Sequence, residues 1–186
     1  MKLKNLWILA FAPVAMLTSC VSGTTEQGDD SDSTSVDSTA TVMSAELMGM
    51  VGDGTSMNSI ELVCDNGDTA YVTPDCDVKG GLLCGDIVYV QCDLNTFEAS
   101  SVINMTSLSH LWAVDGTDGK QHLELDSQGT ANAFNMDQTC DHWNIENGQL
   151  VLINGGERTA YDVTLLSDDS LVIENPSAAI RLYKEN

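Results

Sequence analysis

Cysteine, methionine and histidine are the side chains whose types and spacing could do chemistry in this sequence. Met136, Cys140 and His142 lie close together and offer the soft and borderline ligands that Cu(I) or Zn²⁺ prefers. Residues two apart share a face of an extended strand, so we expect Cys140 and His142 to point the same way. A closed metal site needs further ligands from elsewhere. The trio is a candidate metal site, although the pattern favours a partly buried barrel position for His142.

The first twenty residues have the organisation of a secretory signal. Lys2 and Lys4 precede an apolar stretch over 6–17, which as a helix would be ~18 Å long and too short for a hydrocarbon core of ~30 Å. The quartet Leu17-Thr18-Ser19-Cys20 follows. It resembles the lipobox of bacterial lipoproteins, which implies that 1–19 is a signal peptide and that Cys20 is lipidated. An ordinary signal peptide with a cysteine there by chance is the alternative.

Residues 20–42 are expected to be the lipidated cysteine and a disordered acidic tether. From residue 21 on they contain five acidic residues and no basic or aromatic residue, so they cannot bury enough apolar surface to fold. Val21 after the cysteine is similar to the outer-membrane sorting signal of Gram-negative lipoproteins. The expected location is therefore the outer membrane, through a lipid anchor, on the periplasmic side or at the cell surface.

The remaining cysteines suggest disulfides, because the signal peptide implies an oxidising compartment. Cys84 and Cys92 would lie ~26 Å apart at the two ends of one extended strand, too far to bridge each other. We prefer Cys76–Cys84 together with Cys64–Cys92, and every other pairing of these four remains open unless it joins 84 to 92. Cys140 has no evident partner. Buried free thiols and metal ligation are the alternatives.

Composition excludes several functions. The chain of 186 residues has 28 acidic and 7 basic residues, a formal charge of −21 and 5% aromatic residues, which disfavours nucleic acid as a partner. None of its three histidines lies in a recognisable nucleophile–base arrangement, and no glycine-rich loop precedes a helix. We therefore expect a protein that is not an enzyme and that uses no cofactor.

The elements that must position these side chains are short strands. Apolar residues alternate with polar ones from residue 43 onward, separated by Gly, Asn and Asp turn signals. Residues 43–106 are expected to form a small OB-like five-stranded barrel. The stretch Ile87-Val88-Tyr89-Val90 is apolar on both faces and predicts a central strand. The expected strands of this block are 43–51, 57–64, 68–73, 86–93 and 97–104.

A second block, over residues 107–186, has eight short strands joined by short turns, which predicts an up-and-down meander that closes on itself. Asn147-Gly148 is the strongest hairpin signal, because both residues tolerate positive φ in a type I′ turn. No helix longer than two turns is expected. The expected strands are 110–115, 120–126, 129–135, 140–146, 149–154, 158–165, 170–175 and 179–184.

The second block resembles a known family in its pattern. The run comprises Leu111-Trp112, Leu123-x-Leu125, Trp143-x-Ile145, Gly148-x-Leu150-x-Leu152, Leu171-x-Ile173 and Ile180-x-Leu182-Tyr183. It is similar to the lipocalin-like domains of small Bacteroidetes lipoproteins, and implies an eight-stranded lipocalin-like barrel. The pairing with an OB-like domain distantly resembles NlpE-type envelope lipoproteins, whose two domains come in the opposite order. Their copper-associated Cys-x-x-Cys is absent from this sequence.

Three functions follow from this organisation. The first is a non-enzymatic, membrane-tethered envelope lipoprotein that acts as an interaction or binding module, with an envelope protein or the cell wall as partner. The second is a binder of a small hydrophobic ligand in the second barrel, where Trp112 and Trp143 are candidate contacts, although barrel core is the more common place for them. The third is a metal or envelope-stress sensor. Short strands and an inward set of leucines favour a filled interior, and so the first function: Leu123, Leu125, Leu150, Leu152 and Leu165.

Overall fold

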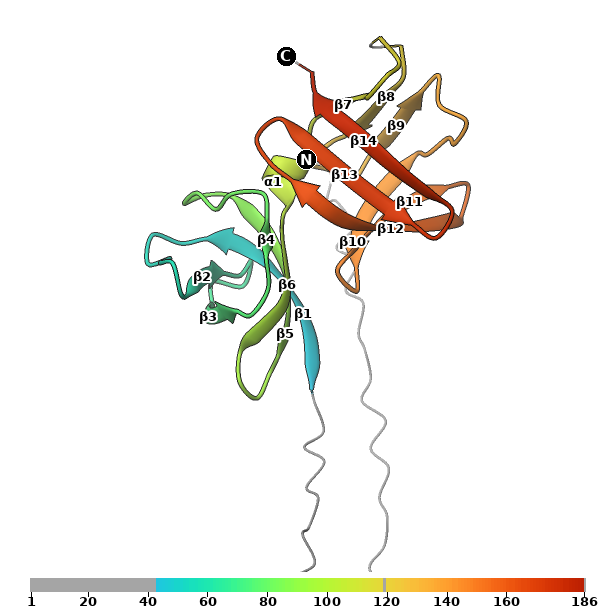
Figure 1. Ribbon diagram of the computed structural model, residues 1–186. Helices are drawn as coiled ribbons and strands as arrows, with labels where there is room; N and C mark the ends of the chain where they lie inside the picture. Colours follow the sequence, from blue (N-terminus) through green and yellow to red (C-terminus); the bar gives the residue numbers. More distant parts are fainter. Residues whose placement is uncertain (1–42, 119, 186) are drawn as a thin grey trace, which may run out of the picture. The chain divides into compact units, whose positions relative to one another are not determined.

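The computed structural model describes residues 43–118 and 120–185, which fold as fourteen strands and one short helix within one compact unit (Figure 1). The expected signal peptide, Cys20 and tether all lie outside the described residues. No helix among the described residues is long and apolar enough to cross a membrane. With fourteen strands and one four-residue helix, the described part of the chain is nearly all-β, as the sequence predicts.

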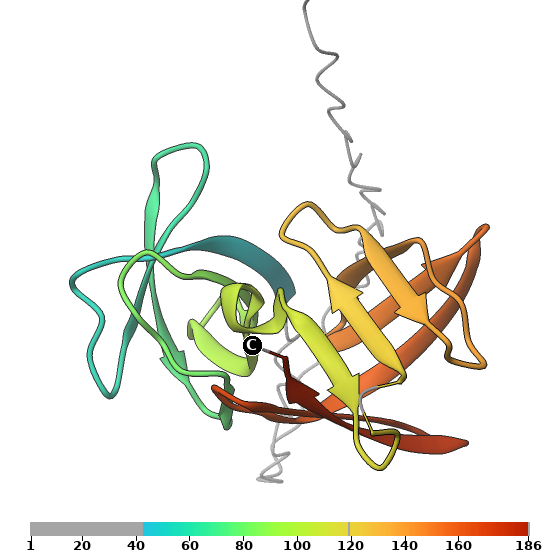
Figure 2. The same ribbon diagram turned by 90° about the horizontal axis from the view of Figure 1, so that it is seen from above.

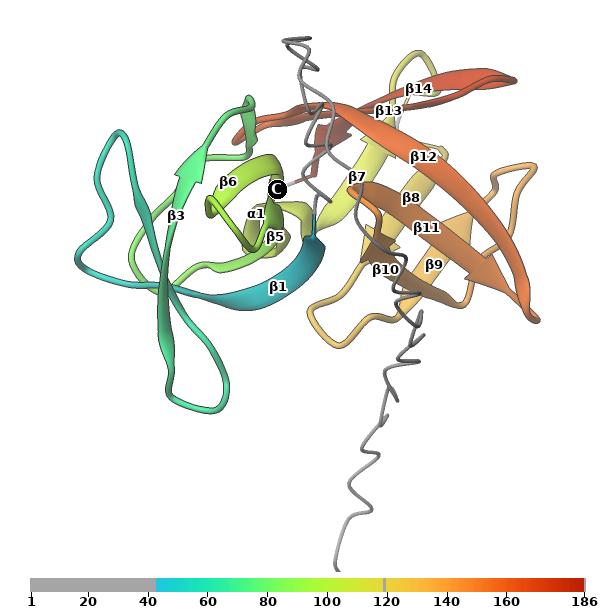
Figure 3. The ribbon, with the colours of Figure 1, turned by 90° about the horizontal axis from the view of Figure 1, so that it is seen from below.

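The first sheet is a small closed barrel of the OB type. Its order is β3-β2-β1-β5-β6-β4, and β3 also pairs in parallel with β6 at Thr73↔Glu98, which closes five long strands into a ring (Figure 3). β4 is a two-residue addition that sequence patterning does not detect. The strands are β1 (Ser44–Val51), β2 (Ile60–Val63), β3 (Thr69–Pro74), β4 (Val78–Lys79), β5 (Ile87–Asp93) and β6 (Glu98–Asn104).

Alternation along β1 separates a core face from an outer face. Gly49 and Val51 are buried, while Glu46, Met48 and Met50 point outward. A Cβ atom on Gly49 would lie 2.7 Å from the carbonyl oxygen of Val63, so glycine permits the close approach of β1 and β2.

The second sheet is an eight-stranded up-and-down meander, as predicted. The order β10-β11-β12-β13-β14-β7-β8-β9 is cyclic in sequence, and Figure 2 shows these strands, yellow to red, curving around a common interior. Between β9 and β10 the barrel nearly closes through two backbone hydrogen bonds, from Ala131 to Asp141 (3.1 Å) and from Trp143 to Gly129 (2.8 Å). The strands are β7 (Leu111–Val114), β8 (His122–Leu125), β9 (Ala131–Phe134), β10 (His142–Glu146), β11 (Gln149–Asn154), β12 (Glu157–Leu166), β13 (Ser170–Asn175) and β14 (Ala178–Lys184).

The turn between β10 and β11 has the geometry that the sequence predicts. Asn147 and Gly148 have φ angles of 50° and 74°, as a type I′ hairpin requires.

The prediction that Leu165 points inward is wrong. The register of β12 on β13 shifts between Val163 and Leu165, so Leu165 is 45% exposed and Leu166 takes the core position.

A short helix, α1 (Met105–Leu108), joins the two barrels, and the outer face of the first barrel packs against one end of the second. Tyr89, Ile103 and Leu108 belong to the same buried cluster as Trp112 and the rest of the second core. This packing explains why the β5 sequence is apolar on both faces: Val88 and Val90 fill the first core, and Tyr89 faces the second.

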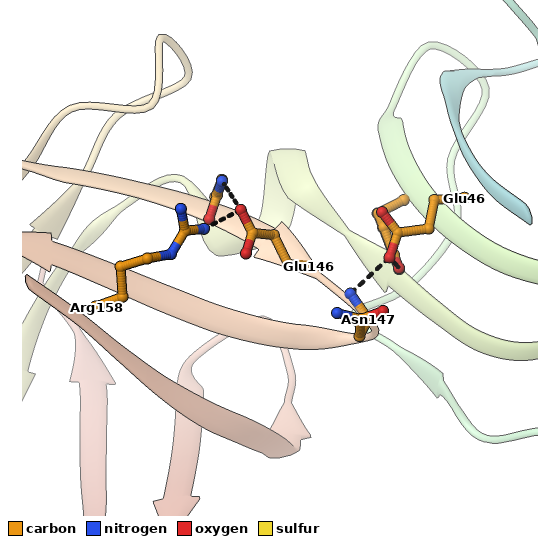
Figure 4. A network of polar contacts seen from close by, with 6 residues as sticks. Glu46, Glu146, Asn147 and Arg158 are labelled. Atoms are coloured by element: carbon orange, nitrogen blue, oxygen red, sulfur yellow. Dashed lines mark hydrogen bonds and ion pairs between the residues drawn. The ribbon is translucent and has the colours of Figure 1, made fainter. Parts of the chain in front are cut away.

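The junction also contains polar contacts at the β10–β11 turn. The backbone N–H of Asn147 donates to Oε1 of Glu46 (2.6 Å), and the N–H of Gly148 donates to the Tyr89 hydroxyl (3.0 Å). Nearby, Glu146 pairs with Arg158 across the sheet (Figure 4).

Candidate ligand site at the open end of the second barrel

The two ends of the second barrel differ. At the end that faces the first barrel, Tyr89, Ile103 and Leu108 cover the core, and Gly80 donates a backbone hydrogen bond to Leu166 (3.0 Å). The interior is filled with buried side chains, as expected from the inward leucines. These include Trp112, Leu123, Leu125, Trp143, Ile145, Leu150, Leu152, Leu171, Ile173 and Leu182. The end of the core that faces the first barrel is therefore covered.

At that opposite end the described residues form a pocket of about 480 Å³. It lies where β7 ends, where β14 begins and beside the loop after β9, and Tyr161 of β12 also lines it. Its volume falls within the range of small-molecule sites. The lining comprises Val114, Asp115, Gln121, Met136, Asp137, Gln138, Tyr161, Ala178, Ala179, Ile180 and Arg181.

The lining combines an apolar base with a polar rim. Val114, Met136 and Ile180 are partly buried against the barrel core. The hydroxyl of Tyr161, a buried residue, donates to Oε1 of Gln138, and burial raises the pKa of this tyrosine. The rim also contains the charged side chains of Asp115, Asp137 and Arg181, so such a pocket suits a small amphiphilic molecule, and no arrangement for proton or group transfer is evident in it.

The candidate metal residues are not brought together. Met136 lines the pocket and Cys140 packs against the barrel core, whereas the side chain of His142 is 66% exposed on the outside, 3.1 Å from Asp141. The expectation that Cys140 and His142 share a face is wrong, because β10 begins only at His142 and the preceding loop turns Cys140 inward.

Other observations also disfavour a metal at this end. Burial and, next, the charge of Asp141 raise the pKa of Cys140 to about 11, which favours the thiol over the ligating thiolate. Among the residues that the structure describes, no group of three or more His, Cys, Asp or Glu side chains could hold a metal ion.

Both candidate tryptophans belong to the barrel core. Trp112 is fully buried, and its indole N–H donates to the carbonyl of Leu108 (2.9 Å). Trp143 is 4% exposed and donates to the carbonyl of Asp126 (2.9 Å). Neither lines the open end, so their role in binding a ligand there remains a prediction without support from the geometry.

The preferred disulfides are absent. Cys64, Cys76, Cys84, Cys92 and Cys140 are all free thiols. Register gives the reason for one pair: Cys92 lies opposite Ala45 of β1, whereas Cys64 follows Val63, which lies opposite Met50. Cys64 and Cys92 are thus about four residues apart along β1, roughly 13 Å, beyond the Cα separation that a disulfide spans.

Cys76 and Cys84, the other preferred pair, lie in different environments. Cys76 packs against the first core, where burial raises its thiol pKa, while Cys84 is exposed in the loop before β5.

Sequence reasoning missed the residues that form the rim of the pocket. These residues lie in loops between strands, and the local sequence there predicts a chain reversal but no binding site: Asp115, Gln121, Asp137 and Gln138. Tyr161 could have been identified from the sequence, because alternation along β12 places it on the inward face before the bulge. A buried tyrosine hydroxyl needs a hydrogen-bond partner, which marks such a position as unusual in an apolar core.

Comparisons with known proteins add little to this geometry. No family model matches the sequence, and no curated protein matches it. Among solved structures, the chain is similar to a lipocalin-like protein from Bacteroides thetaiotaomicron VPI-5482. The two share 27% sequence identity over 42% of this chain and 97% of that chain, with a TM-score of 0.34. The all-β fold of this chain is defined by its own strand order and register.

Proposed function

We propose that this protein is a non-enzymatic binding module of the cell envelope, tethered to the outer membrane through lipid on Cys20, that holds a small amphiphile at the open end of its second barrel. The pocket of about 480 Å³ there carries the proposal. Its apolar base is formed by Met136, Val114 and Ile180, and its polar rim would orient the ligand's polar end.

The pocket changes the ranking of functions drawn from the sequence. A filled interior alone favours contact with an envelope protein. The interior is filled, but the open end retains a volume suited to one small molecule, while the other end is covered by Tyr89, Ile103 and Leu108. A small-molecule partner therefore becomes the preferred one.

The anchor rests on sequence features alone. Leu17-Thr18-Ser19-Cys20 supports lipidation, and Val21 supports sorting to the outer membrane. Cys20→Ala tests this: wild-type protein should fractionate with outer membranes and carry acyl chains by mass spectrometry, whereas the variant should lack them and leave the membrane fraction. Recovery of unacylated wild-type protein in the soluble fraction would refute the anchor.

The pocket is tested by filling it. Met136→Trp places a large ring at the base, whereas Phe134→Trp enlarges a side chain that is 46% exposed on β9 and does not line the pocket. Both are made in full-length Cys20→Ala protein, which needs no competing detergent, and titrated with the neutral probe N-phenyl-1-naphthylamine. Met136→Trp should remove one binding site per chain and Phe134→Trp should remove none. Equal numbers of sites in the two variants would sink the proposal.

A further inference from the structure

A second apolar groove, distinct from the open end, lies where the first barrel meets β10. Its volume is about 470 Å³, and it is formed by β1, β5, α1, the β8–β9 turn and β10. None of its lining residues is shared with the pocket at the open end. The lining comprises Met48, Ile87, Met105, Thr106, Ser109, His110, Ser127, Gln128, Gly129, Trp143, Asn144 and Ile145.

The walls of this groove are held in place before any ligand binds. Glu46, two residues before Met48 and on the same outer face of β1, accepts the N–H of Asn147 at the end of β10 (2.6 Å). The Tyr89 hydroxyl donates to the same Glu46 oxygen (2.9 Å) and accepts the N–H of Gly148 (3.0 Å). Ligand binding would therefore require little ordering of the two walls, which lowers its entropic cost.

The lining contains no charged group, although the chain carries 28 acidic residues. His110 is its only titratable side chain, and burial, followed by the charge of Lys184, lowers the pKa of His110 and keeps it neutral at pH 7. A charged ligand would lose its hydration in this groove without gaining an opposite charge. The groove thus selects for an uncharged ligand.

Its apolar side chains lack a protein partner on one side. Met48 is 53% exposed and Ile87 is 41% exposed on neighbouring strands, and Met105 and Trp143 complete the apolar surface. Thioether side chains adapt to irregular shapes and contact aromatic rings favourably. The Thr106 hydroxyl already accepts the N–H of Ile87 (2.9 Å), so its own proton can be donated to a ligand oxygen or nitrogen.

We propose that this groove is a binding site for an uncharged, largely apolar molecule that carries one hydrogen-bond acceptor. The apolar body of the ligand lies between Met48 and Ile87 on one side and β10 on the other, and the acceptor faces Thr106. This site operates independently of the open end of the barrel, because the two share no lining residue.

The test uses full-length Cys20→Ala protein that also carries Met136→Trp, so that the open end is blocked. N-phenyl-1-naphthylamine, which is neutral and largely apolar, should bind this protein with saturation at one molecule per chain. Adding Met48→Glu should weaken binding at least tenfold, because it introduces a charge into the groove. Ile87→Gln changes polarity without charge and should weaken binding in the same direction, which guards against a folding defect in the first variant.

Met50→Glu is the matched control. Met50 lies on the same outer face of β1, is 42% exposed and does not line the groove, so its replacement should leave the affinity within twofold. Absence of saturable binding in the Met136→Trp protein would overturn the site, as would equal affinities for the Met48→Glu and Met50→Glu proteins. Neither result would bear on the open end, because that pocket is already blocked.

Discussion

The carboxylate of Glu46 in the first barrel accepts a 2.6 Å hydrogen bond from the backbone N–H of Asn147, 101 residues later in the second barrel (Figure 4). The Tyr89 hydroxyl donates to the same oxygen and accepts the N–H of Gly148. Two consecutive N–H groups of the β10–β11 turn are therefore satisfied by the first barrel. This contact fixes the turn at the wall of the inter-barrel groove.

Tyr89→Phe should destabilise the protein by about 1–2 kcal/mol, because it leaves the N–H of Gly148 without its acceptor at a buried junction. Tyr71→Phe is the matched control, since its hydroxyl also donates to a glutamate, Glu61, but the residue is 58% exposed. It should change stability by less than about 0.5 kcal/mol. Urea unfolding monitored by circular dichroism measures both, and equal losses would contradict a structural role for the junction.

The free energy of unfolding should depend on pH above 10 through Tyr89 at the junction. Burial and, next, the hydrogen bond to Glu46 raise the pKa of Tyr89 from 10.0 to about 12, so the fold favours its neutral form. The contribution of this pKa shift to the free energy of unfolding is fully present below pH 10, and it is lost as the pH rises from 10 to 12. The urea midpoint of wild-type protein should fall more steeply across this window than that of Tyr89→Phe. Parallel curves would show that Tyr89 does not contribute.

Leu166→Ala should destabilise the protein by about 2–4 kcal/mol, because Leu166 is 6% exposed and packs in the second core. Leu165→Ala removes the same atoms from a residue that is 45% exposed and should cost less than about 1 kcal/mol. The comparison of the two unfolding free energies tests the bulge in β12 directly. A larger loss for Leu165→Ala would mean that the alternation continues unbroken.

The five described thiols should differ in reactivity. Cys84 is exposed, whereas Cys140 is half-buried with a pKa raised to about 11, and the thiolate is the form that reacts. In native protein at pH 8, iodoacetamide should modify Cys84 at least tenfold faster than Cys140, as followed by peptide mass spectrometry. Unfolding in urea should abolish the difference. Similar rates in the native state would place Cys140 outside the core.

Much of the strand pattern could be predicted from local sequence. β13 occupies 170–175 as expected, and the Asn147-Gly148 turn has the predicted φ angles. β2 begins at Ile60 rather than 57, because Ser56 and Ser59 pair in a turn that leaves Met57 96% exposed. β4 has only two residues, too few for alternation to show.

The candidate sites were predicted less well, because each depends on contacts between distant segments. Cys64 and Cys92 are separated by the register of β1 with its two neighbours, which no local pattern encodes. Cys140 and His142 are separated because the loop before β10 turns one inward and leaves the other outside. Tyr161 and Gln138 meet at the open end although 23 residues lie between them.

The sequence by itself determined the all-β class, the closed meander of the second block and the apolar character of both faces of β5, because alternation and turn residues act within a few positions of one another. Only the tertiary structure decided what covers the second face of β5, which end of the second barrel stays open and where an uncharged groove forms. These outcomes depend on contacts between segments that are far apart in the sequence, such as those of Glu46 and Tyr89 with Asn147 and Gly148, and such segments meet only when both barrels have folded.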